Sequence, residues 1–165
     1  MLLVLPLVAA CARPPAAEPG PPPQPSVEAA LRAAAAAGEV PSDFSVTFSD
    51  EHGMHGGTRI TVSAGGAYAY RNRDPRSGES RAEGTLAASD LRDLIALLVE
   101  LQVWRQETAP RQPVPDESSA GVRVRAGGAE ATMWEWYNDM AANNRLIRIR
   151  TQMSALQQRL RPAGE

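Results

Sequence analysis

Apolar and polar residues alternate in several short stretches of the chain, which is the pattern of a β-strand with one buried face. Residues 44–48 and 58–62 both alternate, and a glycine-rich turn separates them, so together they predict a hairpin. Gly65 and Gly66 predict a turn into a third strand over residues 67–73.

Later stretches extend this strand pattern. Residues 121–125 and 130–137 predict a second hairpin around Gly127 and Gly128. Residues 73–84, by contrast, are charged and interrupted by turn residues, so they predict an exposed loop that returns as a short edge strand.

Apolar residues with helical spacing occur in residues 86–104 and 141–160. The stripe of the first segment is Leu91, Leu94, Ile95, Leu98 and Leu101, and that of the second is Leu146, Ile149, Met153, Leu156 and Leu160. A third helix is predicted within residues 26–42, where Ser26 can cap its start and Gly38 can end it. Because this alanine-rich helix offers few large apolar side chains, we expect it to be a loosely docked stalk.

The order of these elements predicts an α+β domain over residues 43–161, preceded by the alanine-rich helix of residues 26–42. Strands that cluster in hairpins, with helices between and after them, are typical of a small antiparallel sheet with helices packed on one face.

The N-terminus has the features of an export signal. Residues 2–10 form an apolar run that ends in Val8-Ala9-Ala10-Cys11. The run is too short to cross a hydrocarbon layer of about 30 Å as a helix, so residues 1–10 predict a signal peptide, although no basic residue precedes the run. The sequence Val8-Ala9-Ala10-Cys11 resembles the lipobox of bacterial lipoproteins. This resemblance implies cleavage before Cys11 and attachment of a diacylglycerol to its thiol. The alternative is an apolar N-terminus with an inert buried cysteine.

Residues 12–25 contain seven prolines. Proline lacks the amide hydrogen that helices and sheets need, so this stretch predicts an extended, polyproline-like spacer. At about 3.1 Å per residue it could span roughly 40 Å. Residues 11–25 therefore form a linker that would hold a folded domain clear of a membrane to which Cys11 is attached.

Composition narrows the class of protein further. The net charge is −2, and all 17 basic residues are arginine. A chain without a basic excess lacks the field that dominates nucleic-acid affinity, so we expect no DNA or RNA partner. Because Cys11 is the single cysteine, no intrachain disulfide can form, and a structural metal site would need other ligands.

Both histidines, His52 and His55, lie in one predicted loop beside Asp50 and Glu51. Imidazole and carboxylate groups bind ions such as zinc and nickel, so these four residues are candidate metal ligands. The loop lacks the helical His-Glu-x-x-His spacing, and an exposed hairpin tip accounts for the same residues. We favour the exposed turn over a metal site.

Trp134 and Trp136 lie two residues apart in a predicted strand and therefore share one face, whereas Met133 and Tyr137 share the other. Core packing of both tryptophans is the favoured interpretation. In the alternative, one set of aromatic residues is exposed as a binding surface, to which Met54 of the histidine loop would also belong.

Residues 145–161 contain five arginines and no acid. Such a helix could face an anionic lipid surface or an acidic partner, but a solvated face is the simpler interpretation. The chain has no Gly-x-Ser-x-Gly motif and no phosphate-binding glycine loop, so no catalytic residue is predicted and we do not expect an enzyme.

The layout of residues 44–160 resembles emfourin, a family of small bacterial inhibitors of thermolysin-type metalloproteases. The likeness lies in a strand ending near Ser49, the loop Gly53-Met54-His55-Gly56, a leucine-rich helix that ends in an aromatic residue, a hairpin and a terminal helix. The loop has Met54 where the family favours phenylalanine, so no inhibitory residue is carried over. The resemblance implies a protein-binding role, with a protease as one class of partner.

Together these patterns predict a lipid-anchored protein of the cell envelope, on the outer membrane facing the periplasm or the cell surface, that binds another protein without catalysis. The alternative is an envelope hydrolase or metal-binding protein that uses the loop of His52 and His55. The one attached group that we expect is the lipid on Cys11.

Overall fold

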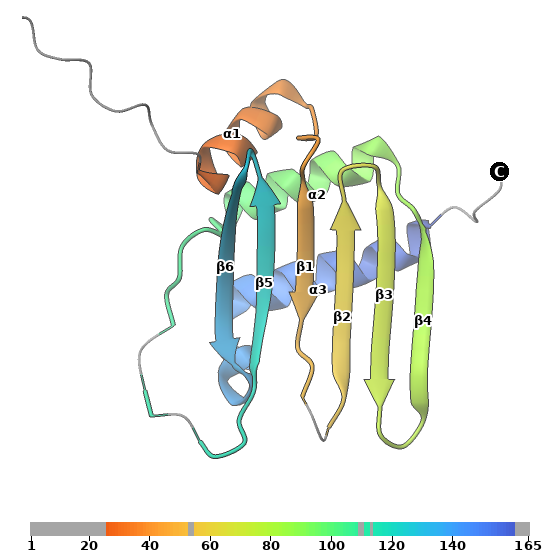
Figure 1. Cartoon of the computed structure of the whole chain (residues 1–165), viewed down its shortest axis with the longest axis vertical. Helices are drawn as coiled ribbons and strands as arrows, with labels where there is room; N and C mark the ends of the chain where they lie inside the picture. Colours follow the sequence, from red (N-terminus) through yellow and green to blue (C-terminus); the bar gives the residue numbers. More distant parts are fainter. Residues whose placement is uncertain (1–25, 53–54, 109–110, 113, 161–165) are drawn as a thin grey trace, which may run out of the picture.

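The computed structural model describes residues 26–52, 55–108, 111–112 and 114–160, and they form the predicted α+β domain (Figure 1). Six antiparallel strands make one sheet in the order β4-β3-β2-β1-β5-β6. The α-helices lie against one face of this sheet, behind it in the view of Figure 1. The predicted signal peptide, Cys11 and the proline-rich linker lie outside the described residues.

The strands follow the alternation in the sequence, and both predicted hairpins are confirmed. Their bounds are β1 Ser45–Ser49, β2 Gly57–Ser63, β3 Ala67–Asp74, β4 Gly78–Thr85, β5 Ser119–Ala126 and β6 Ala129–Trp136. The edge strand β4 is longer than predicted, because it has eight residues and pairs with β3 from end to end. Asp74 closes the turn before it by accepting hydrogen bonds from the amides of Arg76 and Ser77.

The two leucine-rich helices are also confirmed, with ends inside the predicted ranges. The helices are α1 Val27–Ala37, α2 Ala88–Glu100 and α3 Asn144–Leu156, and two short 3₁₀ segments, η1 Tyr137–Ala142 and η2 Gln157–Arg159, flank α3. The Asn143 side chain caps α3 by accepting a hydrogen bond from the amide of Leu146. The apolar stripe of α3 is buried as far as Leu156.

The alanine-rich helix α1 is part of the core, so the prediction of a loosely docked stalk is wrong. Val27, Leu31 and Ala34 recur on one side of α1 and are buried, and the helix contacts α2, β5 and β6. A Cβ placed on Gly127, in the β5–β6 turn, would lie 2.7 Å from the Ala30 Cβ. The small residues Ala30 and Gly127 therefore let α1 approach the sheet closely, and the few apolar side chains of the helix become buried.

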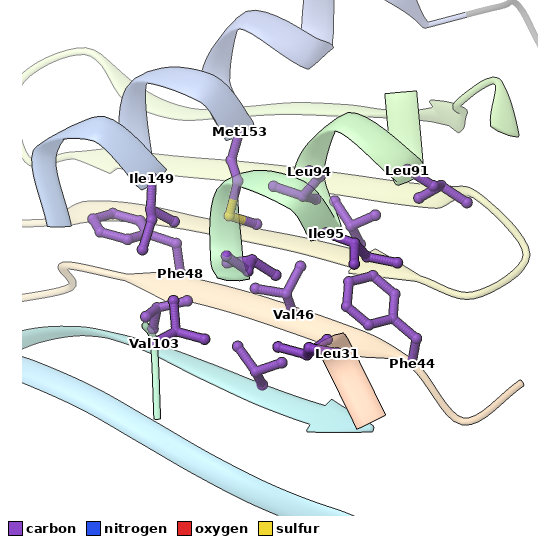
Figure 2. Close-up of a cluster of buried hydrophobic side chains, with 14 of the residues drawn as sticks. Leu31, Phe44, Val46, Phe48, Leu91, Leu94, Ile95, Val103, Ile149 and Met153 are labelled. Carbon is purple, nitrogen blue, oxygen red and sulfur yellow. The ribbon is translucent and has the colours of Figure 1, made fainter. Parts of the chain in front are cut away.

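The core fills the space between the helices and the sheet (Figure 2). Three side chains extend into this core from β1 and from the residue just before it: Phe44, Val46 and Phe48. All three are almost completely buried. They meet side chains of all three helices and of the segment after α2: Leu31, Leu91, Leu94, Ile95, Val103, Ile149 and Met153. One face of the sheet is thus covered.

Truncation of Leu31 on α1 tests whether this helix is part of the cooperative fold. Leu31 has no exposed surface, so Leu31→Ala should lower the free energy of unfolding by about 2–5 kcal/mol. The matched control, Ala33→Gln on the exposed side of the same helix, should change it by less than about 0.5 kcal/mol. Urea unfolding followed by circular dichroism measures both values. Equal stability of the two variants would mean that α1 is a separate stalk.

Candidate functional site

The face of the sheet opposite the helices carries the candidate site, and we call it the open face. No described helix covers it (Figure 1). Its side chains are the outward half of the strand alternation and are mostly polar. They include Thr47, Ser49, Arg59, Thr61, Arg71, Arg73, Glu79, Arg81, Glu83, Gly121, Arg123, Thr132, Trp134 and Trp136.

Three arginines stand side by side across three neighbouring strands of the open face. Arg59 of β2 pairs directly with Arg71 of β3, and Arg71 pairs directly with Arg81 of β4. We call these three residues the arginine row. Like charges directly opposite one another destabilise a sheet, so this arrangement needs a compensating anion.

Glu51, just after β1, supplies most of that compensation. Its Oε2 accepts hydrogen bonds from Arg59 Nε at 2.8 Å and Nη2 at 2.5 Å, and its Oε1 accepts one from Arg71. Burial raises the pKa of the Glu51 carboxyl, but the hydrogen bonds and charges of the two arginines outweigh that effect and hold the pKa below its ordinary value. Arg81 instead donates to Glu79 on its own strand.

Trp134 and Trp136 lie on the open face, so the interpretation that both pack in the core is wrong. Both side chains are only partly buried, and their rings meet edge to face with centroids 5.2 Å apart. Met133 takes the core position of β6 because its partner across the sheet, Val122, points into the core. The guanidinium of Arg111 lies 5.0 Å from the Trp136 ring centroid, a cation–π contact.

Gly121 makes room beside Trp134. The two residues are direct partners on β5 and β6, and a Cβ on Gly121 would lie 3.1 Å from the Trp134 Cβ. Next to them is a shallow hollow of about 470 Å³, lined mainly by hydroxyl groups, two arginines and the indole. Its open-face lining is Thr47, Ser49, Arg59, Ser119, Gly121, Arg123, Thr132 and Trp134. A second hollow, of about 430 Å³, shares Arg59 and continues over Arg71 and Arg81.

The outer edge of β6 is occupied at Trp134 by a side chain that sequence reasoning missed. The Gln106 amide accepts a hydrogen bond from the Trp134 N–H and donates one to the Trp134 carbonyl, both at 3.0 Å. Thr108 also donates to that carbonyl. At this position Gln106 thus takes the place of a neighbouring strand, which hinders pairing of the β6 edge with another chain.

The histidine loop does not bring its four candidate ligands together. The rings of His52 and His55 are neighbours, with centroids 4.6 Å apart, and His52 also meets Tyr137 at 5.6 Å. Asp50 is buried, where it accepts a hydrogen bond from the Thr58 amide. Among the described residues no three His, Cys, Asp or Glu side chains group in a way that could hold a metal ion. Met54 lies outside the described residues.

The arginines of the C-terminal helix have partners on other elements. Arg148 pairs with Glu100 of α2 at 2.8 Å, and Arg150 pairs with Asp50 at 3.2 Å. Arg145 donates to the carbonyls of Leu101, Gln102 and Arg105, and Arg159 pairs with Asp90. These contacts join α3 and η2 to the rest of the domain.

Comparison with known proteins adds no family to these observations. No protein-family model matches the chain, and no curated protein matches it either. Within the part of the chain that the structure describes, no helix is both long and apolar enough to cross a membrane.

Replacement of Glu51 tests its role as the anion of the arginine row. A carboxyl whose pKa is lowered by folding contributes stability above its pKa in the unfolded chain, and that contribution is lost as the pH falls through the folded value. Glu51→Gln should therefore lower the free energy of unfolding by about 1 kcal/mol at neutral pH. The difference from the unchanged protein should shrink below about pH 4.

Urea unfolding at a series of pH values measures this effect. Glu83→Gln is the matched control, because Glu83 also lies on the open face but outside the contacts of Glu51 with Arg59 and Arg71. The same pH dependence in both variants would mean that Glu51 has no special role.

Proposed function

We propose that the chain is a lipid-anchored protein of the cell envelope whose α+β domain binds another protein without catalysis. The observation that supports binding is a partly exposed tryptophan pair on the same, otherwise polar face as the arginine row. Tryptophan and arginine dominate the energetics of protein interfaces, because both bury a large contact area and present specific polar groups.

The geometry favours the open face over the β6 edge and the helix side as the contact region. Gln106 occupies the β6 edge at Trp134, and α1, α2 and α3 cover the opposite face. Trp134 and Trp136 remain partly exposed on the open face, whereas Tyr137 turns toward His52. A partner seated on the open face would therefore reach both tryptophans without disturbing the core.

The proposed anchor rests on the N-terminal sequence. The lipobox-like Val8-Ala9-Ala10-Cys11 and the proline-rich linker together fit a domain tethered to a membrane through lipid on Cys11. We place it on the outer membrane, facing the periplasm or the cell surface. The resemblance of the layout to emfourin would make an envelope protease one class of partner.

A metal-binding function is the second candidate, and the observation that favours it is the 4.6 Å between the ring centroids of His52 and His55. A hydrolase would need carboxylates at the same place, whereas Asp50 and Glu51 are held by hydrogen bonds elsewhere. Stoichiometric zinc or nickel in the purified protein, lost in His52→Ala, would favour this candidate over protein binding.

The anchor is tested by changing Cys11. The native product should carry the mass of an N-terminal diacylglycerol cysteine and fractionate with membranes, whereas Cys11→Ala should lose both properties. Intact-mass spectrometry and membrane fractionation measure them. An unmodified, soluble product from both chains would contradict the anchor but would leave the binding role open.

The binding face is tested by site-specific photo-crosslinking in intact cells. A photo-reactive residue at position 61 or 132, on the open face, should give a discrete adduct with another protein. Positions 96 on α2 and 151 on α3 are exposed like position 132 but lie on the helix side, and they should give none. Trp134→Ala should reduce the adduct at position 132 about tenfold. Adducts of equal yield from both sides would contradict a specific open-face interface.

A further inference from the structure

The arginine row is one part of a longer line of residues that crosses the whole sheet. Ser49 pairs directly with Arg59 on one side and with Gly121 on the other, and Gly121 pairs with Trp134. The line therefore runs Arg81, Arg71, Arg59, Ser49, Gly121, Trp134, with one residue from each strand. Neighbouring strands lie about 4.8 Å apart, so the line is roughly 24 Å long.

The two ends of this line differ in chemistry. At one end stand the three guanidiniums of the arginine row, and at the other end stands the partly buried Trp134 indole. Between them the surface is low at Ser49 and Gly121, because serine has a small side chain and glycine has none. The hollows over the two halves meet at Arg59.

The arginine row keeps unused hydrogen-bond donors. A guanidinium carries five N–H groups, yet within the described residues Arg71 donates only through Nη2, to Glu51, and Arg81 only through Nε, to Glu79. The side chain of Arg81 is 68% exposed. Within the described residues two carboxylates contact the three guanidiniums, so the row keeps donors suited to bidentate carboxylate binding.

We infer that this line is the binding site for an acidic, extended segment of the partner protein, an inference that rests on the proposed protein-binding function. Carboxylates of the segment pair with the arginine row, and a large apolar side chain further along it packs on the Trp134 indole. At about 3.4 Å per residue, an extended segment of about seven residues covers the line.

The surroundings of the line favour a polypeptide over an anionic membrane. Glu51, Glu79 and Glu83 stand within or beside the arginine row, and Glu130 contacts Arg123 and Arg125 near the other end. A uniformly anionic surface would be repelled by these acids. A peptide can donate backbone N–H groups to these acids and can pair its carboxylates with the arginines. It therefore complements both the negative and the positive groups of the surface.

A selection from random peptides of about twelve residues, long enough to cover the line, tests the inference with the full-length protein as bait. Peptides enriched on the unchanged protein should contain clustered Asp or Glu and, before or after the cluster, a large apolar residue. The best of them, labelled with fluorescein, should bind about tenfold more weakly to Arg71→Gln/Arg81→Gln. The control Arg92→Gln, on exposed α2 surface, should bind within about twofold of the unchanged protein.

Four results would overturn the inference. Enriched peptides without an acidic bias would do so, as would equal affinity for the double variant when circular dichroism shows that it is folded. Arginine-dependent binding to vesicles rich in phosphatidylglycerol, without peptide binding, would assign the line to a membrane instead. Failure of the peptides while open-face crosslinks persist would reject the acidic segment and leave the proposed function standing.

Discussion

The burial of β1 at the centre of the sheet is the interaction on which the rest of the domain depends. β1 pairs with β2 on one side and with β5 on the other, and its inward Val46 and Phe48 have no exposed surface. Because strand side chains alternate, this burial turns Thr47 and Ser49 to the open face. A register slip of one residue would exchange the two faces, so the core that holds β1 also determines which side chains reach solvent.

Much of the fold could be predicted from the sequence, because its signals are periodic. The alternation of residues 44–48 and the stripe of α3 each describe a face that must be buried. Two features were not predicted in this way: the full length of β4 and the close packing of α1. The edge strand β4 has few apolar residues to alternate, since its neighbours lie on one side only. Helix α1 packs through Ala30 against Gly127, and such packing depends on close approach, which composition does not reveal.

The candidate site was less predictable, because it depends on pairing between distant segments. The spacing of Trp134 and Trp136 correctly placed both on one face, but which face it is depends on Met133 meeting Val122 across the sheet. Neighbours in the arginine row are separated in sequence by 12 and 10 residues, and only the registers of two successive hairpins align them. Gln106 completes the β6 edge from a loop with no periodic pattern at all.

Two consecutive acids connect this surface to the helix layer. Asp50 points inward, where it accepts a hydrogen bond from the Thr58 amide and pairs with Arg150 of α3 at 3.2 Å. Glu51 points outward and holds Arg59 and Arg71. The segment just after β1 is therefore bound on both faces of the sheet, so the carboxylate that holds Arg59 and Arg71 is itself fixed to the core through Asp50. A surface held in this way presents its charges at defined spacing, which limits the entropy lost when a partner binds.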